Sequence, residues 1–151
     1  MIAQRMPLWT PAFVSTLRLA TDLRRTLETW AHQGYPNERC GLLLGHVTDS
    51  VSEVREVVLA RNLSVSRARD RFELDPEDFI KADARARAEG MEIVGVWHTH
   101  PDQPACPSQI DRESAWSGCS YLILSVGSGG VNGVRAWRLD GAEFIQDDLQ
   151  Q

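Results

Sequence analysis

The amino-acid sequence predicts one α+β domain in which helices pack on a mixed β-sheet. Its 151 residues suit a single domain with a substantial hydrophobic core. No linker, repeat or low-complexity tract divides the chain, and apolar segments recur along its whole length. Strand patterns alternate with helical patterns and then end in a run of strands, an order that favours a mixed sheet.

The predicted strands are short runs that are either continuously apolar or alternate between apolar and polar residues, bounded by turn residues. They cover residues 17–20, 40–47, 51–62, 71–74, 91–100, 120–126, 131–139 and 142–146. The run GSGGVNG at 127–133 lacks the spacing of a phosphate-binding loop and precedes a strand. It therefore predicts a hairpin turn.

Three helices are predicted between these strands, at residues 21–34, 76–90 and 108–116. Thr21 is the expected N-cap of the first helix. Asp75 is the expected N-cap of the second, and Asp78 completes a pattern like a capping box.

Composition and charge narrow the possible partners. The formal net charge of −5 gives no general attraction to nucleic acid or to anionic lipid. No apolar run approaches the roughly 20 residues that a membrane span requires. The N-terminal segment lacks the continuous apolar stretch of a signal peptide, so we expect a cytoplasmic protein with residues 1–14 as a poorly ordered extension. The three cysteines have no CxxC spacing and indicate neither a disulfide framework nor a zinc ribbon.

The stretch GVWHTHPDQPACPSQID at 95–111 carries the most informative residues. Side chains two apart on a strand share a face, so His98 and His100 point the same way. Pro101 ends the strand immediately afterwards. The pair is compatible with a metal site and also with a buried strand that happens to contain two histidines.

Ser108 and Asp111 follow with the spacing of a capping box at a helix start, which is the structural interpretation of this pair. In the functional interpretation Asp111 is a third, anionic ligand beside the two histidines. Three protein ligands leave one tetrahedral position for water, which is typical of catalytic metal sites. Glu38 lies where a loop meets a buried apolar strand, and is a candidate base for that water.

Taken together, these residues resemble the JAMM (MPN+) metalloprotease motif. Glu38 stands in E-x-C-G-x-L-x-G, H-T-H-P follows about 60 residues later, and S-x-x-D comes after a six-residue gap. The flanking elements are similar to those of small bacterial and archaeal members from about residue 17 to the end. The resemblance implies a JAB/MPN fold over 1–151, similar to the layered architecture of cytidine deaminases.

The resemblance also implies a role for each residue of the motif. His98, His100 and Asp111 would bind one catalytic zinc ion. Glu38 would hold the zinc-bound water and act as general base, and Ser108 would stabilise the tetrahedral intermediate.

JAMM enzymes are typically zinc-dependent peptidases or isopeptidases that cut after the C-terminal Gly-Gly of ubiquitin-like proteins. Minimal bacterial relatives trim small ubiquitin-like sulfur-carrier proteins, and such a tail is the expected substrate. One alternative is a peptidase acting on other small or cell-wall peptides. Another is a module that binds ubiquitin-like tails without cutting them, although the presence of Glu38 beside all three ligands argues against it.

Overall fold

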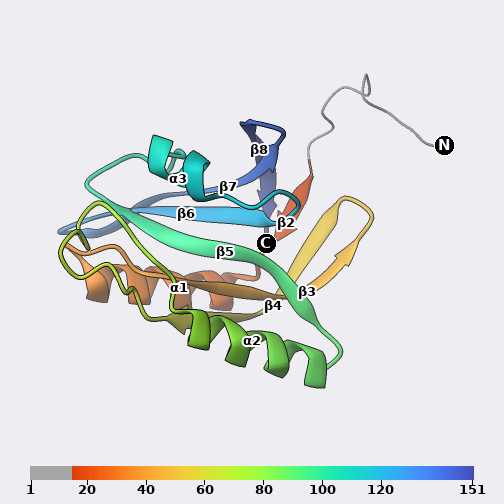
Figure 1. Ribbon diagram of the computed structural model, residues 1–151. Coiled ribbons are helices and arrows are strands. Elements are labelled where there is room, and N and C mark those ends of the chain that lie inside the picture. Colours follow the sequence, from red (N-terminus) through yellow and green to blue (C-terminus); the bar gives the residue numbers. More distant parts are fainter. Residues whose placement is uncertain (1–14) are drawn as a thin grey trace.

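The computed structural model describes residues 15–151 (Figure 1). The N-terminal extension expected at 1–14 lies outside the described residues. The helices are α1 (Thr21–Gly34), α2 (Pro76–Ala88) and α3 (Gln109–Ser114). The strands are β2 (Thr16–Arg18), β3 (Cys40–Thr48), β4 (Val51–Ala60), β5 (Glu92–Pro101), β6 (Ser120–Gly127), β7 (Gly130–Asp140) and β8 (Glu143–Gln150).

The strands form one mixed sheet in the order β2-β4-β3-β5-β6-β7-β8, and this sheet closes into a barrel. Strand β5 runs parallel to β6, and β2 runs parallel to both of its neighbours. The remaining pairs are antiparallel. The predicted mixed α/β domain is therefore confirmed, but the sheet is closed because the three-residue strand β2 bridges β4 and β8. The similarity to the deaminase architecture stays a prediction.

Three local predictions are wrong. Ala20 occupies the N-cap position of α1, and Thr21 is already helical. Residues 71–74 form no strand and contribute only an isolated bridge. The Asp78 side chain does not complete the predicted capping box. It accepts a hydrogen bond from the backbone N–H of Arg61 at 2.8 Å instead, and so ties α2 to the end of β4. The cap predicted at the start of α2 is confirmed, since Asp75 accepts from the second helical residue.

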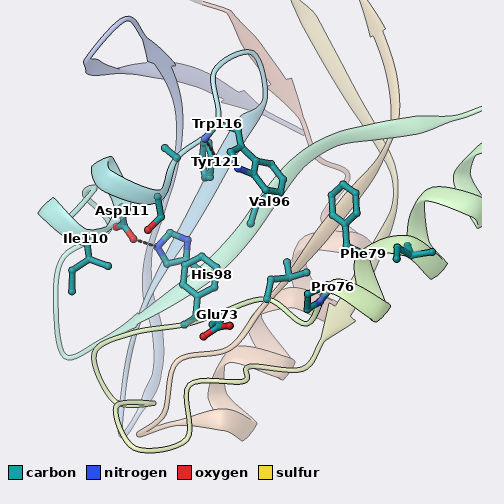
Figure 2. Close-up of a pocket in the computed structure, with 14 residues that line it drawn as sticks. Glu73, Pro76, Phe79, Val96, His98, Ile110, Asp111, Trp116 and Tyr121 are labelled. Atoms are coloured by element: carbon teal, nitrogen blue, oxygen red, sulfur yellow. Dashed lines mark hydrogen bonds and ion pairs between the residues drawn. The ribbon is translucent and has the colours of Figure 1, made fainter.

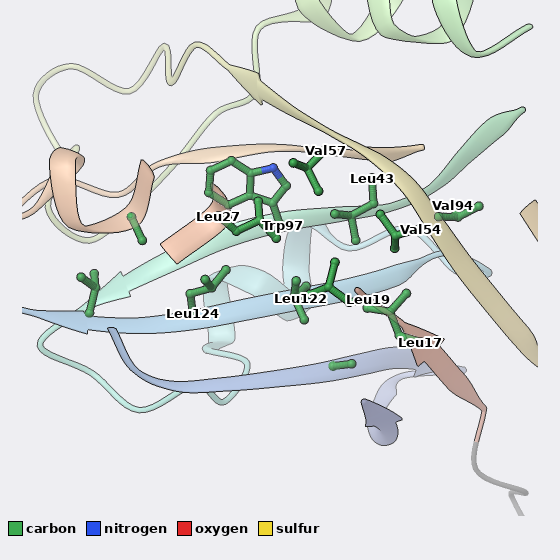
Figure 3. Close-up of a cluster of buried hydrophobic side chains, with 13 residues drawn as sticks. Leu17, Leu19, Leu27, Leu43, Val54, Val57, Val94, Trp97, Leu122 and Leu124 are labelled. Carbon is green, nitrogen blue, oxygen red and sulfur yellow. The ribbon is translucent and has the colours of Figure 1, made fainter. Parts of the chain in front are cut away.

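Strand β5 lies between β3 and β6 and has two buried faces (Figure 1). Trp97 points into a core of leucines and valines that α1 covers (Figure 3). Val96 points the other way, into a second core that α2 covers. Because the faces alternate along the strand, His98 and His100 lie on the Val96 side.

Gly41 on β3 makes room for the Trp97 side chain. The indole Nε1–H donates across β3 to the carbonyl oxygen of Val58 at 2.9 Å. A Cβ atom on Gly41 would collide with that carbonyl oxygen and with the indole. A glycine is thus required where β5 is fixed next to its histidines.

Within residues 15–151, no helix combines the length and the apolar character that crossing a bilayer requires.

Candidate metal centre

The two histidines of β5 are almost completely buried, with exposed fractions of 1% for His98 and 6% for His100. Their Nε2 atoms lie 3.1 Å apart. Thr99, between them, faces the other way and exchanges hydrogen bonds with Arg39: its N–H donates to the Arg39 carbonyl and its Oγ1 accepts from the Arg39 N–H. The predicted common orientation of the histidines is confirmed.

Asp111 reaches this pair from α3. Its Oδ2 lies 3.0 Å from Nε2 of His100, and its Oδ1 lies 3.2 Å from Nε2 of His98. The capping box is also present, because Ser108 Oγ accepts from the Asp111 N–H and Asp111 Oδ2 accepts from the Ser108 N–H. The two interpretations of the Ser-x-x-Asp pattern are therefore compatible. The cap holds the Asp111 carboxylate in position against the histidines.

The donor set fits a tetrahedral divalent cation. Ligand atoms about 2.0–2.2 Å from a tetrahedral zinc ion lie about 3.3–3.6 Å from one another. The distances of 3.0–3.2 Å between these atoms are close to that spacing. His100 Nδ1 must donate to the carbonyl of Pro104 at 2.9 Å, since a carbonyl only accepts, so a neutral His100 ring carries its lone pair on Nε2. One ligand atom from each of His98, His100 and Asp111 thus lies close to a single point.

His98 is held by packing. Its Nδ1 is buried without a hydrogen-bond partner among the described residues. The ring of Phe72 stacks on the His98 ring at a centroid distance of 4.5 Å. Burial lowers the pKa of His98 more than the neighbouring Asp111 raises it, which keeps the ring neutral and able to act as a ligand.

Asp111 stays ionised in the same surroundings. Burial favours its neutral form, but hydrogen bonds with His100 and His98 outweigh that effect and hold the pKa of Asp111 well below its usual range. An ionised carboxylate next to a neutral imidazole is the protonation state that metal binding requires.

The register between β3 and β5 places Glu38 next to these ligands. Cys40 pairs with His98, and Arg39 exchanges hydrogen bonds with Thr99, so continuing the antiparallel pairing places Glu38 opposite His100 on the same face. The Glu38 side chain is buried, with 7% of the residue exposed. Burial raises its pKa to about 8, against an opposing attraction to His100. A carboxyl group that titrates near neutrality can both accept and return a proton.

Asn62 fixes the backbone around Glu38. Its Nδ2 donates to the carbonyls of Glu38 and Arg71, at 3.1 and 3.2 Å. Its Oδ1 accepts from the N–H groups of Ser64 and Glu73, both at 2.9 Å. One side chain thus organises the loop from 61 to 74 and joins it to the residue predicted to be the base.

The loop between Pro101 and Ser108 is held by its backbone carbonyls. Gln103 accepts from the hydroxyl of Ser125, Pro104 from His100, and Ala105 from the indole of Trp137. Three successive peptide groups are therefore fixed by buried or half-buried side chains. They connect β5 to α3 and set the position from which Asp111 reaches the histidines.

A largely apolar pocket of about 420 Å³ opens beside the centre (Figure 2). His98 and Asp111 form part of its wall. The rest comes from the loop before α2, from α2 itself, from β5, α3 and β6, and from the segment between α3 and β6. Trp116 stands edge-on to Phe79 at a ring-centroid distance of 5.7 Å.

All five residues predicted for the site lie together around this centre, and their chemical roles stay predictions. The sequence motif does not include Asn62, Phe72 or Trp116. Asn62 and Phe72 gave no signal, since an asparagine after a strand and a phenylalanine in an apolar run are ordinary. Trp116 gave a weak one, as a tryptophan in the polar setting SAWSG.

Residues 20–140 match the family described as prokaryotic homologs of the JAB domain. The chain is 37% identical to the desampylase of Haloferax volcanii, over 74% of this chain and 81% of that protein. It is 32% identical to the probable TtuB-protein conjugate cleaving protease of Thermus thermophilus, over 78% of this chain and 74% of that one. The solution structure of a Desulfitobacterium hafniense protein has a similar fold, with a TM-score of 0.79 and 27% identity over 88% of this chain and 90% of that chain.

Proposed function

The chain belongs to the prokaryotic JAB-domain family of JAMM (MPN+) hydrolases, and from this membership we propose that it is a zinc-dependent peptidase or isopeptidase acting on a ubiquitin-like protein. It hydrolyses the bond that follows the C-terminal Gly-Gly of that protein, and the proposed substrate is a sulfur carrier. The names of the two relatives support this proposal, since one is a probable TtuB-protein conjugate cleaving protease and the other is a desampylase. The match spans most of each of them.

The observation that carries the proposal is the convergence of ligand atoms from three side chains next to the buried carboxyl group of Glu38. His98, His100 and Asp111 would hold the zinc ion. Zinc bound there would supply Lewis-acid chemistry, lowering the pKa of water and polarising the scissile carbonyl.

Glu38 and Ser108 are the proposed catalytic residues. Glu38 takes a proton from the attacking water and delivers it to the leaving amine, for which its raised pKa is suited. Ser108 Oγ already accepts the N–H of Asp111, so its own O–H remains free to donate to the developing oxyanion.

The test uses a ubiquitin-like carrier with extra residues after Gly-Gly, followed by mass spectrometry with zinc and after chelation. We expect zinc-dependent removal of the extra residues. Glu38→Gln should bind zinc and lose about 10²–10⁴-fold in turnover, and Ser108→Ala should lose about 10²–10³-fold in kcat. Binding of the carrier without any cleavage would instead support a tail-binding module.

A further inference from the structure

The apolar pocket beside the metal centre has no role in the chemistry described so far. The described residues that line it are mostly apolar or aromatic, and those with polar groups besides tryptophan are Glu73, His98, Asp111, Ser114 and Tyr121. Its volume of about 420 Å³ exceeds that of any single amino-acid side chain and lies in the range of pockets that hold small ligands, about 300–1,000 Å³.

The mouth of this pocket is apolar and open to solvent. Ile80 on α2 is 66% exposed and Trp116 is 58% exposed, and both line it. Phe79 lies across the pocket from Asp111 (Figure 2). Exposed apolar side chains around a concave apolar wall are typical of a binding site, because they gain free energy only when a ligand covers them.

The reach of an extended substrate limits what can fill the pocket. The wall of the pocket begins at His98 and Asp111 of the metal centre. A substrate chain with its scissile carbonyl at the metal centre therefore brings only the side chains next to the scissile bond into the pocket. Successive residues of an extended chain are about 3.3–3.6 Å apart. On the acyl side of the proposed substrate, two glycines cover roughly the nearest 7 Å without any side chain. The nearest substrate side chain then belongs to the residue after the scissile bond.

We propose that this pocket binds a large apolar side chain of the residue immediately after Gly-Gly, and thereby selects which tails are removed. The inference rests on the proposed function, since it takes Gly-Gly as the acyl side. An anionic or amide side chain at that position would lose its hydration against the apolar wall formed by Phe79, Trp116 and Ile80. Glu73 at the pocket would in addition repel a carboxylate.

The experiment compares ubiquitin-like carriers that differ only in the residue after Gly-Gly, using leucine, its near-isosteric polar counterpart asparagine, aspartate and alanine. The zinc-loaded protein should cleave the leucine carrier with a kcat/KM about 10–100-fold above that of the asparagine carrier. Trp116→Ala and Ile80→Glu should reduce this ratio to less than about threefold, because one removes a wall and the other places a charge at the mouth. Both side chains are largely exposed, so neither substitution disturbs the core.

Val47→Ser is the matched control, because Val47 is also exposed, at 47%, and lies seven residues along β3 from Cys40. It should leave the ratio unchanged. Equal cleavage of all four carriers, or a preference that follows the residue before Gly-Gly, would refute the pocket assignment alone. Failure to cleave any carrier would refute the proposed function and the pocket assignment with it.

Discussion

Replacing Glu38 by glutamine should make the metal-free protein more stable at neutral pH. The folded protein holds this carboxyl group buried, with a pKa of about 8 in place of the ordinary 4.5. The unfolded chain releases the proton at about pH 4.5, whereas the folded chain keeps it until about pH 8. Between these values the unfolded state is favoured increasingly as the pH rises, because it binds fewer protons. Glutamine has nearly the same shape and does not titrate.

The size of the effect follows from the pKa difference. Each pH unit between the two pKa values changes the free energy of unfolding by about 1.4 kcal/mol. Between pH 5 and pH 7 the free energy of unfolding of the wild-type protein should therefore fall by about 2–3 kcal/mol because of Glu38, and that of the variant should not show this fall. For a domain of this length, that difference corresponds to a shift in Tm of about 4–12 °C.

Urea denaturation of both metal-free proteins at pH 5 and pH 7 measures this difference. The stability gained by Glu38→Gln should grow between the two pH values, while Glu92→Gln, at an exposed position where β5 begins, should show no such growth. A gain of the same size at both pH values would show that burial does not perturb the Glu38 carboxyl group, and would remove the reason for regarding it as poised for proton transfer.

Three further predictions concern the groups around the centre. Zinc at 100 times its dissociation constant should raise the unfolding free energy of the metal-free protein by about 2.7 kcal/mol. Asp111→Ala should abolish the corresponding rise in Tm. A rise in Tm that persisted in this variant would show that the ion binds elsewhere. Phe72→Ala should weaken zinc binding about tenfold in a competition titration, because stacking is what orients the His98 ring, whereas Phe144→Ala should not. Asn62→Ala should lower the unfolding free energy by about 2–4 kcal/mol in urea, since four hydrogen bonds of about 0.5–1 kcal/mol each are lost. The exposed Asn132→Ala should change it by less than about 0.5 kcal/mol, and equal losses in the two variants would contradict the proposed role of Asn62.

Much of the secondary structure could be predicted because its signals are local. The apolar run from Cys40 and the alternation after Val51 are patterns of neighbouring residues, and both strands are present. Asp75 and Ser108 cap helices as predicted, since a cap depends on the next two or three residues. Residues 71–74 do not form the predicted strand, because the Asn62 side chain accepts the Glu73 N–H that a strand pairing would have used.

The sequence by itself determined which chemical groups face one another along the chain: the period of a strand put His98 and His100 on one side, and the spacing of a capping box fixed Asp111 to Ser108. The tertiary structure decided what these groups meet. Only the pairing of β3 with β5 brings Glu38 opposite His100, and only the anchored loop after Pro101 carries Asp111 to both histidines. The closure of the barrel by β2 and the apolar pocket depend in the same way on segments far apart in the chain. Forming such contacts costs chain entropy and depends on the packing of the whole domain, so they cannot be predicted from any short stretch of sequence.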